Sequence, residues 1–129
     1  MSKYVNWIEY QGRPIMFVNY AGLHDEAEYL RAIKEFESET LKQPPGSRFR
    51  ILTDVTDSIL TSAILQGNKD AAARAKEAGI PDNPTALVGL AGFKLATAHA
   101  FSFFRPGLYF ASSMQDAKDW LVKQKLDDK

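Results

Sequence analysis

Residues 49–62, which read FRILTDVTDSILTS, constrain the fold of this chain more than any other stretch. Phe49, Ile51 and Leu52 form a short apolar run without strict alternation, which is typical of a strand covered on both faces. Turn-forming side chains then interrupt the run, because Asp, Thr and Ser bond to nearby backbone groups. The stretch therefore predicts a central strand that passes through a polar turn into a helix, as in α/β proteins.

The polar turn has two interpretations. In the first, it leads into a helix N-cap, and Ser58, Thr61 or Ser62 accepts hydrogen bonds from the first helical amides. In the second, it is a regulatory switch, because phosphate on a hydroxyl at a helix N-terminus is electrostatically favourable. The candidates for a switch or an interaction site are Asp54, Thr56, Asp57, Ser58, Thr61 and Ser62.

The chain opens with two runs rich in strand-forming residues. They lie at residues 4–10 and 15–20, and the Gln11-Gly12 turn between them predicts a hairpin. A helix is expected to begin after Asp25, with Glu28 at capping-box spacing. Pro44 and the residues after it end this helix.

Helices and strands alternate through the rest of the chain. We expect a helix at 61–78, a strand at 85–90, a helix at 93–104, a strand at 108–111 and a last helix capped by Ser112 or Ser113. Small side chains give the 61–78 helix a smooth face that is expected to lie close to the sheet: Ala71, Ala72, Ala75 and Ala78. Gly67 in the same helix indicates either a mobile start to the helix or tight packing, and tight packing is the favoured interpretation.

Strands that are separated by helices pair in parallel through right-handed crossovers. The order β-β-α-β-α-β-α-β-α therefore predicts an α/β fold with a mixed, mostly parallel sheet and an antiparallel N-terminal hairpin strand. Residues 1–129 are expected to form a single domain, since no linker or repeat divides them.

Composition excludes several classes of function. Sixteen Lys and Arg residues balance sixteen Asp and Glu residues, which argues against nonspecific nucleic-acid binding and electrostatic membrane attachment. The chain has no cysteine, so disulfides and thiolate chemistry are excluded. No run resembles a signal peptide or a transmembrane segment. A soluble cytoplasmic protein is the expectation.

Patterns of catalytic or metal-binding residues are missing from the sequence. His24 and His99 lie far apart, and neither has a metal-ligand spacing to another histidine or a carboxylate. No G-x-S-x-G motif is present. A turn accounts for Asp54 and Asp57. We therefore expect no enzyme, no cofactor and no metal.

An apolar pocket is a further feature that the sequence suggests. Aromatic residues crowd residues 101–110, where the run FSFF precedes Arg105-Pro106-Gly107. The GLAG turn at 89–92 is either a nest of backbone amides for an anion or a sharp turn from strand to helix. The candidates for a ligand pocket are Gly89, Gly92, Phe101 and Phe104.

Four stretches resemble the SpoIIAA-like, STAS/SEC14-type single-domain bacterial proteins. They read IMFVNYAGL, PPGSRFRILTDVTDS, ALVGLAGFK and YFASSMQDAKDWL, and together they extend over nearly the whole chain. The resemblance implies a mixed sheet with helices packed on it. It also implies that SEC14-type relatives, which hold lipids, share this architecture.

The resemblance bears on the polar turn as well. In the anti-sigma-factor antagonists of this fold, a partner kinase phosphorylates a Ser or Thr at the start of the second helix. Asp57-Ser58 resembles that motif. Ile59 and Leu60 replace the second hydroxyl and the glycines that follow it in those proteins.

Two functions remain as expectations. The first is a non-enzymatic regulatory or protein-interaction module that uses residues 54–62 to bind an unknown protein. The second is a binder of a small apolar, lipid-like or anionic ligand in a pocket beside the second and third helices. The aromatic cluster is also compatible with a homodimer, and no nucleic-acid partner is expected.

Overall fold

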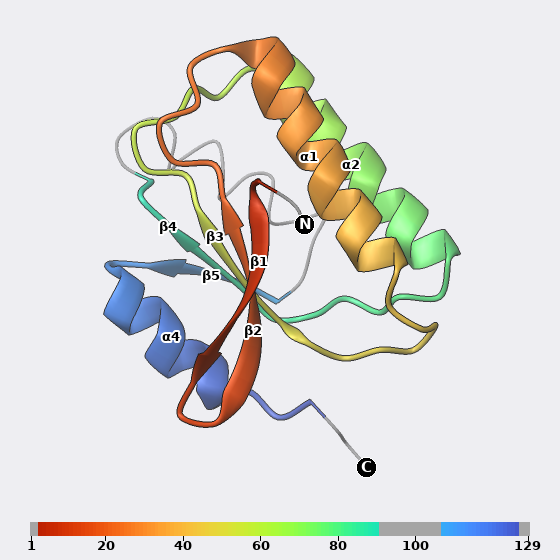
Figure 1. Ribbon diagram of the computed structural model, residues 1–129, viewed down its shortest axis with the longest axis vertical. Coiled ribbons are helices and arrows are strands. Elements are labelled where there is room, and N and C mark those ends of the chain that lie inside the picture. The colour runs from red at the N-terminus through yellow and green to blue at the C-terminus, as the bar shows by residue number, and fades with distance from the viewer. Residues whose placement is uncertain (1–2, 91–106, 127–129) are drawn as a thin grey trace.

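A mixed sheet forms the centre of the molecule (Figure 1). The computed structural model describes residues 3–90 and 107–126. The strands follow one another in the sheet as they do in the chain: β1 (Val5–Tyr10), β2 (Arg13–Asn19), β3 (Arg50–Asp54), β4 (Thr85–Val88) and β5 (Leu108–Ala111). β1 and β2 are antiparallel, and each later neighbouring pair is parallel. The predicted α/β fold is confirmed.

Helices cover both faces of the sheet. The helices of the described residues are α1 (Glu26–Leu41), α2 (Ser62–Glu77) and α4 (Met114–Val122). α1 and α2 lie side by side on one face, and α4 covers the other (Figure 1). The helix predicted at residues 93–104 lies outside the described residues. None of the described helices combines the length and the apolar character needed to cross a membrane.

The alternation of side chains along the strands produces two hydrophobic cores. Met16 and Ile51 belong to the core under α1 and α2, whereas Ile15 and Leu52 belong to the core under α4. Adjacent residues of β2 and β3 are thus buried on opposite faces. This double burial explains why the apolar runs in the sequence do not alternate with polar residues.

The turn and the helix caps follow local chemistry. Gln11 and Gly12 both have a positive φ, at 53° and 77°, as the tight hairpin between β1 and β2 requires. Thr61 caps α2 by accepting a hydrogen bond from the Ile64 amide at 3.2 Å, and Ser113 caps α4 in the same way. Both helix starts agree with the sequence-based expectation.

The start of α1 differs from the predicted capping box. Asp25 occupies the N-cap position, but its side chain makes no capping hydrogen bond with any described residue. Glu28 instead accepts a hydrogen bond from the Tyr4 hydroxyl at 2.7 Å. A partner that is distant in sequence has replaced the local one, so the capping-box prediction is wrong.

The helices α1 and α2 approach each other closely at Gly67. A Cβ atom at this position would lie 3.1 Å from Leu30 Cδ2 and 3.6 Å from Ile33 Cδ1. Arg74 of α2 and Glu37 of α1 form a two-point ion pair across the same helix interface. Tight packing therefore explains the glycine, as the sequence indicated.

Arg50, at the start of β3, connects the sheet to the C-terminal end of α4. Its residue is 8% exposed, and its guanidinium donates to the carbonyl oxygens of Leu121 and Gln124, each at 2.8 Å. Burial, and then the like charge of Arg13, lowers the pKa of Arg50. The positive charge lies at the C-terminal end of α4, where helix carbonyls have no helical partners.

We predict that Arg50→Met lowers the free energy of unfolding by roughly 2–3 kcal/mol, because one buried and one partly buried carbonyl oxygen lose a charged donor. Urea denaturation followed by circular dichroism measures the change. The control is Arg13→Met on the neighbouring strand, where the arginine is exposed. The control should stay within about 0.5 kcal/mol of the wild type. Equal losses in the two variants would contradict this role for Arg50.

Candidate functional site

The polar turn after β3 is built on Asp54. Its Oδ1 accepts hydrogen bonds from the Thr56 amide at 2.9 Å and the Thr56 hydroxyl at 2.6 Å. Asp57 follows with a φ of 55°, a conformation that aspartate tolerates better than most residues. Local hydrogen bonds therefore account for the shape of the turn, as the first interpretation of the sequence predicts.

The turn is also fastened to the loop between β2 and α1. The amides of Tyr20, Gly22 and Ile59 pair with the carbonyl oxygens of Asp54, Thr56 and Leu23, at 2.8, 2.9 and 3.0 Å. His24 Nε2 adds a hydrogen bond to the Asp57 carbonyl oxygen at 2.7 Å. The two loops form one hydrogen-bonded unit at the edge where the parallel strands end.

Ser58 lies inside the protein rather than on this edge. The residue is 4% exposed, and its hydroxyl donates to the Val55 carbonyl oxygen at 2.7 Å. Burial raises the pKa of Tyr29 to about 12, against the lowering effect of a side-chain hydrogen bond with Ser58. Phosphorylation of Ser58 would require the hydroxyl to leave this interior position.

The other candidate residues of the turn differ in exposure. Thr61 is half-buried and donates to Glu26 Oε2 at 2.6 Å while it caps α2. Asp54 is also half-buried. Thr56, Asp57 and Ser62 are exposed. The structure thus leaves these three side chains as the accessible part of the predicted interaction site.

Gly89 is explained by packing against the turn. Its φ is +99°, and a Cβ atom built on it would lie 2.3 Å from Thr56 Oγ1 and 2.6 Å from Thr56 Cα. Gly89 does not line the cavity described below, although Leu87 and Leu90 do. The other pocket candidates, Gly92, Phe101 and Phe104, lie outside the described residues.

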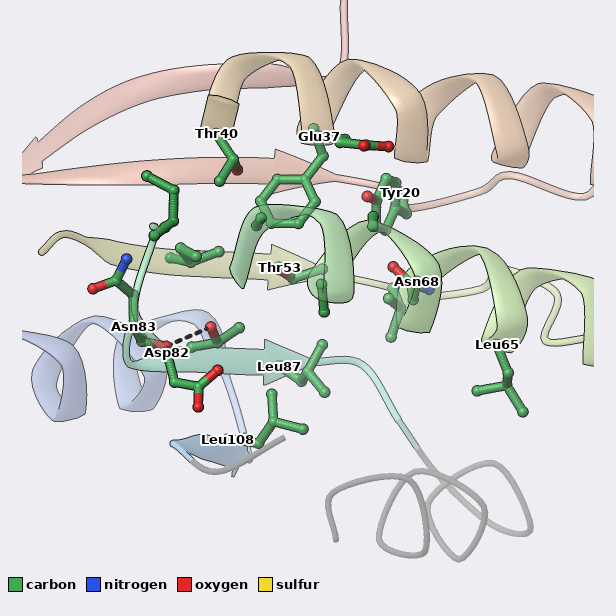
Figure 2. A pocket seen from close by; sticks show the side chains of 18 of the residues that line it. Tyr20, Glu37, Thr40, Thr53, Leu65, Asn68, Asp82, Asn83, Leu87 and Leu108 are labelled. Atoms are coloured by element: carbon green, nitrogen blue, oxygen red, sulfur yellow. Dashed lines mark hydrogen bonds between the residues drawn. The ribbon is translucent and has the colours of Figure 1, made fainter. Parts of the chain in front are cut away.

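A cavity of about 130 Å³ lies between the sheet and the helices α1 and α2 (Figure 2). Its floor includes Thr53 of β3, Leu87 of β4 and Leu108 of β5. Its roof includes Thr40 of α1 and the small side chains of α2, which are Ala71, Ala72 and Ala75. The smooth alanine face was expected to lie against the sheet, but it borders open space, because methyl groups are too short to fill the gap.

The charged groups of the cavity wall are acidic and paired. Glu37 and Asp82 line it, and no lysine or arginine does so in the described part of the chain. The Arg74 guanidinium holds the pKa of Glu37 below its usual range. Lys76 lies 3.6 Å from Asp82. The wall therefore offers no free positive charge to an anion from the residues described.

The hydroxyl of Thr40 is a buried polar group in the cavity wall. The residue is 5% exposed, and its Oγ1 has no hydrogen-bond partner within the described residues. Asn83, by contrast, is 2% exposed and fully engaged, since it accepts from Arg48 and Phe49 and donates to Ser47. The Asn83 side chain therefore holds neighbouring segments together, whereas the Thr40 hydroxyl makes no such bond within the described residues.

The described residues hold no group of three or more His, Asp or Glu side chains placed to bind a metal. Comparisons with family models and with curated proteins give no match. A solved structure does match: an uncharacterised protein of the DUF3478 family with a SpoIIAA-like fold, from Shewanella loihica PV-4. The match covers 91% of each chain with a TM-score of 0.64 and 19% sequence identity.

The chain has a SpoIIAA-like fold. At 19% identity the likeness establishes the fold alone, and it confirms the resemblance seen in the four sequence stretches. The SpoIIAA-like fold hosts both candidate sites in this chain. The turn lies where the parallel strands end, and the cavity lies under the helix pair on one face of the sheet.

The sequence predicts a pocket beside the second and third helices. The cavity of this SpoIIAA-like chain lies beside the second helix, α2, and also under α1, while the predicted third helix lies outside the described residues. Two signals in the sequence pointed there. Thr40 continues the apolar stripe of Ile33 and Phe36 at helical spacing. A threonine within such a stripe faces the protein interior, so its hydroxyl is expected to be buried. The alanines of α2 were the second signal, because small residues that face a sheet leave space.

We predict that Gly89→Ala lowers the free energy of unfolding by roughly 3 kcal/mol or more, since backbone strain adds to a steric clash with Thr56. The control is Gly12→Ala, which has a similarly positive φ of +77° but no atom within 4 Å of the added Cβ. It should cost about 1–2 kcal/mol. Urea denaturation of both variants measures the difference. Equal costs would show that the approach of Thr56 to Gly89 is unimportant.

Proposed function

We propose that this protein binds a small apolar ligand in the cavity between the sheet and the helices α1 and α2. The supporting observation is a cavity of about 130 Å³ with walls of leucine, alanine and aromatic side chains. Ligand pockets in proteins are concave, mostly apolar and supplied with a few polar groups. Thr40 and Thr53 are polar groups of this kind.

The volume of the cavity limits the ligand. An apolar cavity of about 150 Å³ holds one benzene ring, whereas pockets for drug-sized ligands measure about 300–1,000 Å³. The ligand is therefore the size of one ring or a short aliphatic chain. A two-chain lipid is too large to be enclosed in this space.

The charge of the wall favours a neutral ligand over the anionic one that the sequence left open. An anion in the cavity would lie beside Glu37 and would lose its hydration without gaining a cationic partner. Arg74 and Lys76 are already paired with Glu37 and Asp82, so their positive charges balance these carboxylates and are not free to bind an anionic ligand. A neutral apolar molecule avoids both costs.

The proposal includes no chemical step. Tyr29 lines the cavity, but with a pKa of about 12 its hydroxyl stays protonated near neutral pH. Glu37 is engaged by Arg74 and is a poor base because its pKa is lowered. Neither group is therefore suited to proton transfer.

We predict that benzene binds the wild type with saturation at one molecule per chain and raises its melting temperature, because the ligand binds only the folded state. Ala71→Leu should abolish this binding, since the longer side chain fills the cavity from the α2 side. NMR titration and thermal unfolding in the presence of benzene measure binding. The control is Ala73→Leu, an exposed position on the same helix that does not line the cavity.

The wild type and Ala73→Leu should bind benzene equally. Native mass spectrometry of the protein from its own host then identifies the natural ligand by its added mass. Lack of saturable binding to the wild type would refute the proposal. Unchanged binding to Ala71→Leu would show that the ligand occupies another place.

A second candidate function is protein interaction through the turn at residues 54–62. It is supported by the exposure of Thr56, Asp57 and Ser62 on a turn whose backbone is hydrogen-bonded to neighbouring segments at several positions. Such a surface needs little ordering when a partner binds, so less conformational entropy is lost. In this form the regulatory module would use the exposed side chains and not the buried Ser58.

We predict that Asp57→Asn reduces recovery of a protein partner several-fold in a pull-down from host lysate, because the exposed carboxylate is neutralised. Asparagine tolerates the positive φ of this position, so stability should stay within about 0.5 kcal/mol of the wild type. The matched control is Asp70→Asn, an exposed aspartate in the middle of α2. A partner that is retained equally by both variants does not use this turn.

A further inference from the structure

We infer that the ligand of the cavity carries one neutral hydrogen-bonding group, such as an alcohol or phenol hydroxyl, and that this group bonds to Thr40 Oγ1. The inference rests on the proposed function and adds the chemical class of the ligand. It combines three observations: the state of the Thr40 hydroxyl, the distribution of polar groups along the cavity, and the pairing of the nearby charges.

The Thr40 hydroxyl is buried but unused. A threonine in a helix normally donates its hydroxyl to a carbonyl oxygen three or four residues earlier, which here would be Glu37 or Phe36. Thr40 makes no such bond, and its Oγ1 has no partner in residues 3–90 and 107–126. Yet the side chain lines the cavity and is 5% exposed. Its hydroxyl therefore lies at the cavity wall, shielded from bulk water and without a partner among the described residues.

Retention of such a group costs stability. A buried hydroxyl without a partner loses its hydration and gains no hydrogen bond in return. Valine has nearly the same shape without this cost, so packing alone does not explain a threonine at this position. A ligand that donates to or accepts from Oγ1 recovers the lost interaction in the bound state.

The two ends of the cavity differ in the residues that line them. Figure 2 shows Thr40, Asp82 and Asn83 toward the end where β3 and β4 begin, and Leu65 and Asn68 toward the opposite end. The lining near that opposite end also includes Leu60 and Leu90, which follow the ends of the parallel strands. The Asn68 amide nitrogen already donates to the Ile64 carbonyl oxygen at 3.2 Å. A ligand whose polar group bonds to Thr40 would extend its apolar body toward the leucines.

Neighbouring charges select a neutral group. Glu37 lies one helical turn before Thr40, and a carboxylate ligand would lose its hydration there without gaining a free cationic partner from the described residues. A cationic ligand gains little, because Arg74 and Lys76 already neutralise Glu37 and Asp82. An uncharged hydroxyl or amide group avoids both conflicts and still bonds to Oγ1.

The test compares phenol with benzene on the wild type and on Thr40→Val. The two ligands have nearly the same shape, and so do the two side chains, so the double comparison isolates the hydroxyl pair. The ratio of phenol to benzene affinity should fall roughly three- to tenfold in Thr40→Val, as expected for one net hydrogen bond. Thr40→Ser, which keeps the hydroxyl, should retain the wild-type ratio. NMR titration measures all three proteins.

The outcomes separate this inference from the proposed function. If benzene and phenol both bind but their ratio is the same in the wild type and Thr40→Val, the role of Thr40 is refuted and the cavity function stands. Benzoate binding tighter than phenol would overturn the neutral class in the same way. If neither benzene nor phenol binds the wild type, both proposals fail.

Discussion

The structure depends on the burial of β3 on both of its faces. Ile51 packs under α1 and α2, while its neighbour Leu52 packs under α4. Because successive side chains of a strand point to opposite faces, this strand requires helices on both sides of the sheet. Each end of β3 contacts a different helix layer. Arg50 at its start binds the C-terminal end of α4, and Asp54 at its end shapes the turn that leads into α2.

The cavity is a consequence of how the layer above β3 is built. α1 and α2 approach each other closely at Gly67 and are joined by Glu37 and Arg74. Three of the α2 residues that line the cavity are alanines, whose methyl groups do not reach its floor: Ala71, Ala72 and Ala75. Close packing within the helix pair and loose packing beneath it therefore occur in the same layer. Protein interiors are usually filled, so an apolar space of this size is a candidate for a ligand.

The two candidate sites make different demands on their residues. At the turn, Asp54, Ser58 and Gly89 maintain the backbone conformation through hydrogen bonds and close packing. The exposed side chains, those of Thr56, Asp57 and Ser62, are the ones that a partner can contact. In the cavity, the Thr40 hydroxyl makes no hydrogen bond with the described residues. A polar group that the fold does not use is a stronger indication of binding than one that the fold requires.

The sequence by itself determined the order of the described elements, the mostly parallel sheet and the hairpin, and it limited the helix caps to Ser58, Thr61 or Ser62 and to Ser112 or Ser113. These features depend on side-chain periodicity and on contacts between residues close in the chain. Tertiary structure alone decided that Ser58 is buried beside Tyr29, that Glu28 bonds to Tyr4, and that Thr40 faces a cavity. Each of these outcomes depends on the distance between segments far apart in the chain. Local propensity carries no information about such distances. The cavity therefore depends on how α1 and α2 pack on the sheet, which only the tertiary structure shows.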